Sequence, residues 1–293
     1  TLKMLDKKPF LGIIGGSGIY ELNNIVNAKW LSINSLFGNP SDNILTGSID
    51  GINIAFLPRH GKNHNLLPSA INYRANIDCL KSLGVTDIIS LSAVGSLKNK
   101  IKPGNFVIVD QFIDRTFARS KTFFDEGIVA HVSMAKPVSE QLSKLILKSA
   151  PKDINISLGG TYLAMEGPQF STLAESELYR SWNCDVIGMT NMPEAKLARE
   201  AEIAYATIAM VTDYDCWHPD HDAVTVDNII AVLNNNSKNA KKLVLNIIKN
   251  ISEKTWTWDD PAYTALENAI ITPKEAQPEK AKQKLQNIAK NYL

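Results

Sequence analysis

Residues 10–18 read FLGIIGGSG, and this stretch decides the fold class. It is a short apolar run that stops at a turn rich in glycine, which predicts a buried strand followed by a tight loop. No charged or polar side chain interrupts the run before the turn. Strands that are apolar throughout are buried on both faces and are typical of parallel sheets. The stretch therefore favours an α/β fold.

The same alternation of elements continues along the chain. Further apolar runs predict strands at residues 53–57, 87–91, 106–109, 184–189 and 204–211. Apolar residues at helical spacing predict helices at 69–83, 137–150, 173–182 and 193–201, and then two helical stretches without a strand between them over 227–251. Together they predict one domain, residues 1–252, in which a central mixed, largely parallel β-sheet is flanked by helices.

Residues 253–293 are predicted to form a helical C-terminal extension. Asp260-Pro261 and Thr272-Pro273 resemble helix starts, and Glu275 gives the second the spacing of a capping box. The last segment is amphipathic, with one apolar face formed by Ala281, Leu285, Ile288, Ala289 and Tyr292. We expect this face to pack on the main domain or on a neighbouring subunit.

The composition excludes several classes of protein. The 31 Lys and Arg residues nearly balance the 30 Asp and Glu residues, so no basic stripe for nucleic acid is expected. Cys79, Cys184 and Cys216 have no CxxC or CxxH neighbour, which argues against a disulfide framework and against a metal site. No apolar segment reaches the approximately 18 residues of a membrane helix, and the first residues lack a leader pattern. We expect a cytoplasmic protein that binds no membrane.

Small and cationic residues follow three of the predicted strands. They are the glycine turn with Ser17, the segment Arg59-His60-Gly61, and the segment SAVGS at 92–96. Each one alone is compatible with an ordinary turn or a solvated arginine. Because open α/β sheets bind ligands at strand ends, the three together predict an anion site with guanidinium, hydroxyl and backbone N–H donors.

Three later segments carry the densest functional signal: EGPQFS at 166–171, GMTNMPE at 188–194 and TDYDCW at 212–217. Together with the glycine turn and PRHG at 58–61, they resemble the trimeric purine nucleoside phosphorylases, and specifically their S-methyl-5'-thioadenosine phosphorylase branch. The resemblance runs from about residue 10 to residue 245. The chain after residue 252 carries no motif of this family.

The resemblance implies a pentosyltransferase that serves purine and methionine salvage. Inorganic phosphate would attack the anomeric carbon of S-methyl-5'-thioadenosine and give adenine and S-methyl-5-thio-ribose 1-phosphate. Phosphate is a co-substrate, so no cofactor is expected. The resemblance also implies a homotrimer or a multiple of trimers.

Site residues are assigned by the same resemblance. The implied phosphate site comprises Ser17, Arg59, His60, Ser92, Ala93 and Thr190. The implied nucleoside site comprises His64, Phe170, Ser171, Met189, Asp213, Asp215, Val226, Ile229 and, from a neighbouring subunit, His131. Asp213 and Asp215 would be catalytic. Asp213 would protonate the leaving purine at N7, and the neighbouring charge of Asp215 would favour its protonated form.

Other functions remain open at the level of the sequence. Within the same class, the substrate could be inosine, guanosine or methylthioinosine. An oxidoreductase could use the glycine turn for a dinucleotide, although the turn fits GxGxxG only out of register. A nucleoside-binding protein without catalysis is a third alternative, against which the intact phosphate residues argue.

Overall fold

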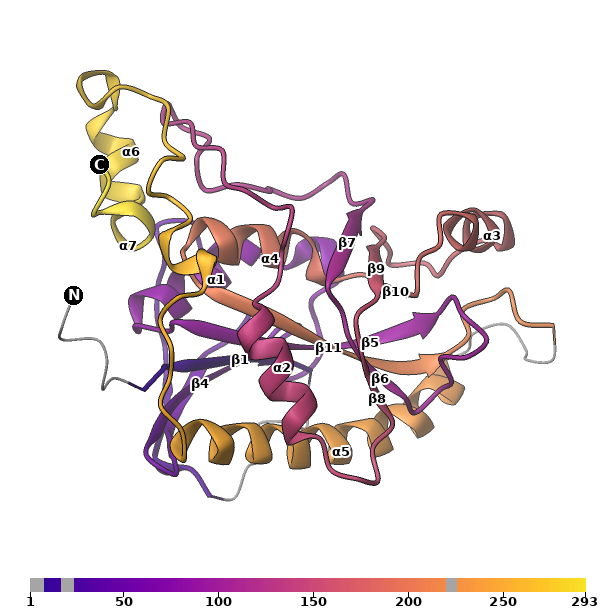
Figure 1. Ribbon diagram of the computed structural model, residues 1–293. Coiled ribbons are helices and arrows are strands. Elements are labelled where there is room, and N and C mark those ends of the chain that lie inside the picture. The colour runs from indigo at the N-terminus through magenta and orange to yellow at the C-terminus, as the bar shows by residue number, and fades with distance from the viewer. Residues whose placement is uncertain (1–7, 17–23, 220–225) are drawn as a thin grey trace.

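The computed structural model describes residues 8–16, 24–219 and 226–293, and Figure 1 shows a central sheet with helices on both sides. The strands are β1 (Leu11–Gly15), β2 (Val26–Leu31), β3 (Ile44–Ile49), β4 (Ile52–Pro58), β5 (Asp87–Ser96), β6 (Phe106–Ile108), β7 (Gln111–Asp114), β8 (Ile156–Leu158), β9 (Thr161–Ala164), β10 (Val186–Gly188) and β11 (Ala204–Asp213). The helices are α1 (Tyr73–Ser82), α2 (Glu140–Ser149), α3 (Leu173–Ser181), α4 (Asn191–Glu200), α5 (Val226–Ser252), α6 (Glu279–Lys284) and α7 (Gln286–Ala289).

The sheet is organised around β5. On one side β5 pairs with β1, which pairs in turn with β4, and all three strands are parallel. On its other side β5 pairs with β11 in parallel and, near its end, with β10 in antiparallel orientation. The antiparallel strands β3 and β2 extend the edge beyond β4, while β9 and β7 continue in parallel beyond β10. The predicted α/β class with a mixed, largely parallel sheet is thus confirmed.

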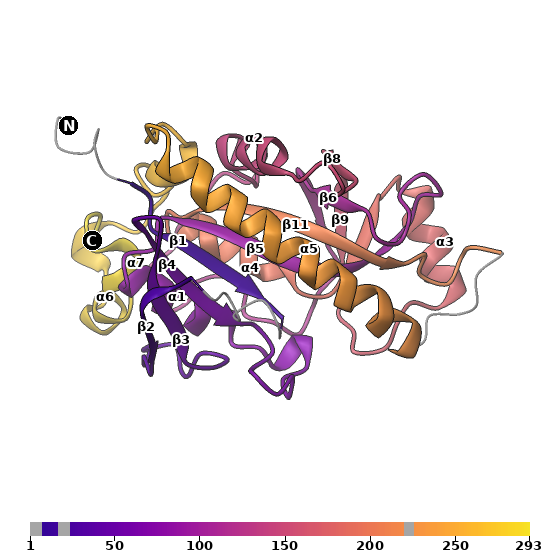
Figure 2. The ribbon, with the colours of Figure 1, turned by 90° about the horizontal axis from the view of Figure 1, so that it is seen from below.

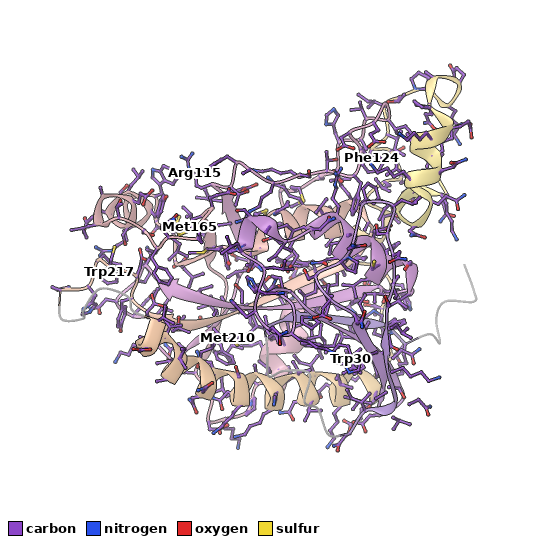
Figure 3. The ribbon with its side chains drawn as sticks, turned by 180° about the vertical axis from the view of Figure 1, so that it is seen from behind. Trp30, Arg115, Phe124, Met165, Met210 and Trp217 are labelled. Carbon is purple, nitrogen blue, oxygen red and sulfur yellow. The ribbon has the colours of Figure 1, made fainter. Side chains whose placement is uncertain are left out.

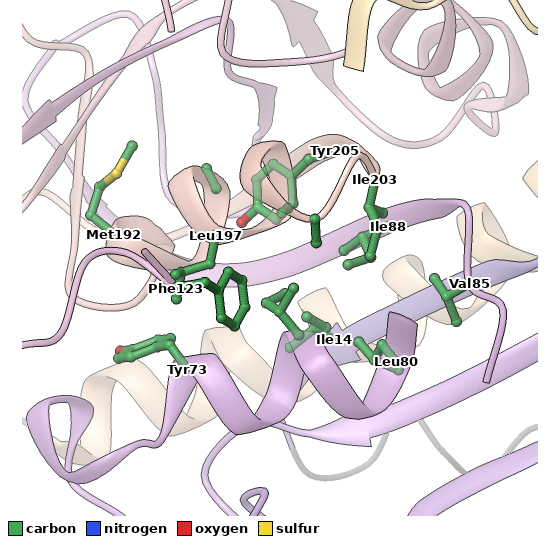
Figure 4. Packing of buried hydrophobic residues seen from close by; sticks show 14 of the residues in the cluster. Ile14, Tyr73, Leu80, Val85, Ile88, Phe123, Met192, Leu197, Ile203 and Tyr205 are labelled. Atoms are coloured by element: carbon green, nitrogen blue, oxygen red, sulfur yellow. The ribbon is translucent and has the colours of Figure 1, made fainter. Parts of the chain in front are cut away.

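Helices cover both faces of the sheet, which explains why β1 is apolar throughout. Leu11 and Ile13 pack in one hydrophobic cluster with Leu243 of α5. Ile14 points to the opposite face and packs in a second cluster with Leu197 of α4, as Figure 4 shows. Figure 2 shows α5 lying along the first of these faces. Burial of side chains on both faces is the dominant favourable term in this arrangement.

Two details differ from the sequence-based expectation. The two helical stretches predicted over residues 227–251 form one continuous helix, α5. Its run of asparagines does not break it, because the buried Asn236 donates from Nδ2 to the carbonyl of Val211 at 2.9 Å. The strands β2, β3, β7, β8 and β9 were not predicted. β7, β8 and β9 have at most four residues each, and β2 is exposed along most of its length, so their sequences carry little periodicity.

The C-terminal segment packs on the main domain, at the upper left in Figure 1. Ala281, Leu285, Ile288 and Ala289 are buried in the same cluster as α1 and α4. The segment also pairs with the chain before α2, through the bridge between Ala130 and Ile270. Of the described helices, none is both long and apolar enough to cross a membrane.

The structure has only a short 3-10 turn at each of the two helix starts predicted in this segment. Asp260 accepts a hydrogen bond from the N–H of Ala262, but it begins only the 3-10 turn Pro261–Thr264. The predicted capping box at Thr272 is wrong, because the Thr272 hydroxyl accepts from the N–H of Val129 instead. Tertiary contact with the main domain has replaced the local cap.

A buried carboxyl links this segment to the central strand. Asp87 begins β5 and is fully buried, and its Oδ1 accepts a hydrogen bond from the hydroxyl of Tyr263 at 2.8 Å. Burial raises the pKa of Asp87 to about 7, against the opposing effect of hydrogen bonds from Thr86 and Tyr263. The negative charge of Asp260 raises it further. A carboxyl with a raised pKa favours the folded state most when it is protonated.

We therefore expect Asp87→Asn to change how stability depends on pH. Between about pH 4 and pH 7 the folded wild type holds a proton on Asp87 that the unfolded chain has already released. The stability of the wild type therefore falls as pH rises through this window. The amide keeps an acceptor for Tyr263 but cannot ionise. Chemical denaturation of both proteins at pH 4 to 8 should show the variant gaining relative to wild type as pH rises. A pH-independent difference would contradict the assignment.

Candidate active site

The three segments predicted to carry an anion site lie together in the structure, although the segment at 92–96 does not follow a strand as predicted but forms the second half of β5. Gly15 at the end of β1 lies opposite Pro58 at the end of β4, and Ile14 lies opposite Ser90 of β5. The N–H of Arg59 donates to the carbonyl of Gly15 at 2.9 Å, which joins two of the ends directly. The sheet therefore brings the segments after β1 and β4 to the middle of β5. Ser17 lies outside the described residues.

Arg59 is buried and held by several partners. Its Nε donates to Oε2 of Glu194 at 2.7 Å, and Nη2 donates to Oε1 of the same carboxylate at 2.9 Å. Nη2 also donates to the Ser90 hydroxyl, and Nη1 donates to the carbonyl of Leu91. Burial alone would lower the pKa of Arg59, but the charge of Glu194 more than offsets this and raises it. Four of the five guanidinium N–H groups thus have partners among the described residues, and one N–H on Nη1 remains.

His60 follows Arg59 and is uncharged at neutral pH. Burial lowers the pKa of His60 to about 4, and the charge of Arg59 lowers it further. Its Nδ1 lies 2.8 Å from the carbonyl of Leu66, so Nδ1 carries the proton and Nε2 is an acceptor. The ring stacks on that of His64, with 4.4 Å between the ring centroids. The structure thus brings His64 against His60.

Ser92 and Thr190 form the part of the site richest in hydroxyl groups. Ser92 lies on β5, and Thr190 is the residue before α4. Their hydroxyl oxygens are 3.4 Å apart, and both residues are buried. Ala93 follows Ser92 and is exposed, so its backbone is accessible. The start of α4 adds partially positive N–H groups on the same side.

The two predicted catalytic carboxyls lie where β11 ends beside β5. Asp213 lies opposite Gly95, three residues after Ser92. Its Oδ1 accepts from the N–H of Asp215 at 2.8 Å, so the two carboxyls are coupled through the backbone. Asp215 is buried in a left-handed backbone conformation with φ of 54°, and its Oδ2 has no hydrogen-bond partner in the described part of the chain. Strained backbone and unpaired polar atoms of this kind concentrate at functional sites.

The surroundings of Asp213 are compatible with a protonated carboxyl. Burial raises its pKa, and the charge of Asp215 adds to this effect. The Thr212 hydroxyl lies 2.6 Å from Oδ2 of Asp213 and 3.2 Å from the carbonyl of Val94. When the Thr212 proton points to Val94, the oxygen of Thr212 can accept a proton from Asp213. The site can therefore hold Asp213 in either protonation state.

Phe170 and Ser171 follow β9, and Met189 follows β10, the strand that pairs with β5 at Gly95. Phe170 is 45% exposed, which is unusual for a large apolar side chain and leaves its ring free for stacking. Ser171 is buried, and its carbonyl accepts from the thiol of Cys216, next to Asp215. Figure 3 shows Met165 and Trp217, which flank this region, at the end of the molecule near α3.

Arg119 organises these segments, although nothing in its local sequence distinguished it. Its guanidinium donates to three carbonyls, those of Glu166 at 2.9 Å and of Met189 and Met192 at 2.6 Å each. The side chain is buried, and the loop that carries it precedes α2. Arg119 thereby fixes the backbone of the predicted sugar-contacting residue Met189.

Three predicted residues do not join this cluster within the described chain. Val226 and Ile229 occupy the first turn of α5, directly after the undescribed residues 220–225, and Val226 is largely exposed. His131 is exposed and lines a cavity of about 1020 Å³ whose wall contains none of the other predicted site residues. Its position away from the chain's own cluster is compatible with a contact to another subunit.

The sequence reasoning also missed Glu194 and Tyr162. Glu194 stands in the motif GMTNMPE, and a carboxylate in a predicted buried segment signals a cationic partner. Tyr162 is fully buried on β9, and its hydroxyl oxygen lies 3.0 Å from that of Ser92. In the described chain, no group of three His, Cys, Asp or Glu side chains is arranged to hold a metal ion.

The chain is similar to proteins of known family. Residues 10–249 match the model of the phosphorylase superfamily. The chain is 55% identical over 289 residues to the S-methyl-5'-thioadenosine phosphorylase of Rhodospirillum rubrum, with 98% of each chain covered. It is also 55% identical over 284 residues to the enzyme of that name from Bradyrhizobium diazoefficiens, with 97% of this chain and 98% of the relative covered.

Solved structures agree with this. A methylthioadenosine phosphorylase from an antarctic soil metagenomic library superposes with a TM-score of 0.89 at 46% identity, covering 96% of this chain and 99% of that one. A variant of the adenosine/methylthioadenosine phosphorylase of Schistosoma mansoni, in complex with methylthioadenosine, gives 0.79 at 34% identity, covering 88% and 97%. The chain therefore belongs to the phosphorylase superfamily and, within it, to the S-methyl-5'-thioadenosine phosphorylase family.

Proposed function

We propose that this protein cleaves S-methyl-5'-thioadenosine with inorganic phosphate, releasing adenine and S-methyl-5-thio-ribose 1-phosphate. The observation that carries the proposal is the meeting of two groups of residues on β5. Donors for an anion surround Ser92, and the half-buried Asp213 and the buried Asp215 lie three residues further along, beside Gly95. A phosphate and a purine on either side of a ribose ring need this pair of adjacent sites.

The phosphate would be held by Ser92, Thr190, the backbone at Ala93 and the remaining N–H of Arg59. The guanidinium charge is already paired with Glu194 at 2.7 Å, so hydroxyl and N–H dipoles contribute much of the binding. His60 presents Nε2 as an acceptor, which suits a phosphate oxygen that carries a proton. Ser17, which follows β1 in the sequence, would complete the site.

The nucleoside would lie between this anion and the carboxyls. A phosphate oxygen attacks the anomeric carbon while the N-glycosidic bond breaks, and the bonding electrons leave with the purine. Positive charge then grows on the sugar, where the phosphate stabilises it. Asp213 transfers its proton to N7 of the departing base and accepts from the 6-amino group through its other carboxyl oxygen, and Asp215 adds a further hydrogen bond to the base. Phe170 would stack on the base, with Ser171 at its edge and Met189 and His64 along the sugar.

We also propose that the enzyme works as a homotrimer or a multiple of trimers. The exposed apolar side chains near α3 support a subunit contact, since patches of this kind seldom face water. They include Phe117 at 81% exposure, Leu173 at 58% and Trp182 at 42%. His131 would reach the nucleoside of the neighbouring subunit, while Val226 and Ile229 would enclose the apolar methylthio group.

The reaction as proposed needs no cofactor, because phosphate itself is the second substrate. We propose a cytoplasmic location, which suits an enzyme of nucleoside salvage. We propose small molecules and further copies of this chain as its partners, with neither nucleic acid nor membrane among them. The nearly balanced charge supports this.

The first test is the release of adenine from S-methyl-5'-thioadenosine with and without inorganic phosphate. We expect release to depend on phosphate and to yield equal amounts of adenine and sugar phosphate, measured by chromatography. Adenine release that is independent of phosphate would mean that water is the nucleophile, and the phosphorylase assignment would then be wrong.

Arg59→Ala should raise the KM for phosphate about 10- to 100-fold and leave the KM for the nucleoside nearly unchanged, because a charged hydrogen bond contributes about 1.5–3 kcal/mol. The variant also leaves Glu194 buried without a counter-charge, which costs about 3–5 kcal/mol of stability. The double variant Arg59→Ala/Glu194→Gln removes that charge and serves as the control. A normal phosphate KM in the double variant would exclude Arg59 from the phosphate site.

Substitution of Asp213 should alter the choice of base. A 6-amino group donates hydrogen bonds and a 6-oxo group accepts them, so wild type should prefer methylthioadenosine to methylthioinosine. Asp213→Asn should reduce this preference, because an amide can donate to the 6-oxygen. Asp213→Ala should lower kcat more than it raises KM, since protonation of N7 strengthens towards the transition state. Competition between the two nucleosides in one reaction measures the preference, and faster cleavage of the 6-oxo substrate by wild type would refute the adenine assignment.

A further inference from the structure

Tyr162 occupies a position that the reaction outlined above does not yet use. It lies on β9, beside β10, and its side chain is fully buried. Its hydroxyl oxygen is 3.0 Å from Oγ of Ser92 and 3.5 Å from the backbone nitrogen of Thr190. The tyrosine hydroxyl thus contacts both residues that offer hydroxyl groups to the anion.

Glycine at position 188 makes room for this hydroxyl. A Cβ atom built on Gly188 would lie 1.9 Å from Oη of Tyr162 and 2.4 Å from Cζ. No side chain can occupy position 188 while Tyr162 keeps this orientation, because real Cβ atoms do not approach other atoms so closely. The pair therefore fixes the hydroxyl against Ser92 by packing as well as by hydrogen bonding.

The chemistry of the three groups sets the direction of the hydrogen bonds. The backbone N–H of Thr190 can only donate, so the oxygen of Tyr162 accepts from it. Tyr162 then has its own proton available, and Ser92 Oγ is the nearest acceptor at 3.0 Å. A serine oxygen that accepts from Tyr162 keeps its own proton free for another acceptor. Cooperative chains of this kind strengthen each member.

We propose that Tyr162 is a positioning residue for the phosphate substrate. It orients the Ser92 hydroxyl as a donor towards a phosphate oxygen. The inference rests on the proposed phosphorolysis and adds to it a residue that acts through Ser92 without touching the reacting atoms. Its contribution concerns phosphate and leaves the nucleoside side of the site unaffected.

The test is Tyr162→Phe, which deletes the hydroxyl and keeps the ring that packs against Gly188. We expect the KM for phosphate to rise about 3- to 10-fold, as for the loss of one neutral hydrogen bond. The KM for the nucleoside and kcat at saturating phosphate should stay within about twofold. Because a fraction of unfolded enzyme lowers the apparent kcat but not KM, partial misfolding cannot imitate this result. Calorimetric titration of the variant with phosphate alone should show the same weakening.

Two further variants test whether the Tyr162 hydroxyl acts on phosphate through Ser92 or through a general effect on the fold. Ser92→Ala removes the group through which Tyr162 acts, so Tyr162→Phe in that background should change the phosphate KM little. Tyr263→Phe also deletes a tyrosine hydroxyl that makes a hydrogen bond, at 2.8 Å to Asp87, but it lies away from the site and should leave the phosphate KM unchanged. An unchanged phosphate KM in Tyr162→Phe, or additive effects with Ser92→Ala, would overturn the inference. Wild-type phosphate dependence would stand in either case, whereas its loss would overturn the proposed function itself.

Discussion

The buried ion pair between Arg59 and Glu194 is the interaction on which the rest of the site depends. It joins the end of β4 to α4, and Ser90 of β5 and Tyr205 of β11 donate to the same carboxylate. Charges this deeply buried favour folding only when their hydrogen bonds are satisfied, and here the two side chains satisfy each other in a two-point contact. These hydrogen bonds thereby fix β4, β5, β11 and α4 relative to one another. The proposed phosphate donors, Ser92 on β5 and Thr190 before α4, are attached to this framework.

The pair also sets the electrostatics of the site. Its neutralised guanidinium and the uncharged ring of His60 leave an environment of oriented dipoles instead of excess positive charge. Preorganised dipoles can stabilise charge that develops during the reaction without trapping the product phosphate ester as strongly as a free cation would. On the other side, Asp213 and Asp215 share a region where burial favours protonated carboxyls. In the proposed reaction the substrates would therefore lie between polar groups with little net charge and the two carboxyls.

The sequence predicted the parts of this arrangement that depend on local pattern. The apolar runs identified β1, β4, β5 and β11, and the rule that ligands bind at strand ends grouped Arg59 with Ser92, while the family resemblance added Asp213. The sequence did not reveal which side chains contact those residues. Glu194 lies 135 positions from Arg59, Tyr162 lies 70 positions from Ser92, and Arg119 contacts carbonyls 47 to 73 positions away. Such contacts follow from strand order and leave no periodicity in the chain. The capping box at Thr272 failed for the same reason, because a distant N–H competed for the hydroxyl.

The C-terminal segment has a consequence for the order of events during synthesis. Tyr263 bonds to Asp87 across 176 positions, and Leu285 and Ile288 complete the hydrophobic cluster that contains Ile14 of the first strand. The chain segment with His131 is likewise held by residues 269–271. Contacts between such distant parts of a chain form late, because a long loop must close before they stabilise anything. The nascent sheet thus keeps apolar surface uncovered until residues 263–288 have left the ribosome, and exposed apolar surface of this kind makes a partly folded chain prone to aggregation.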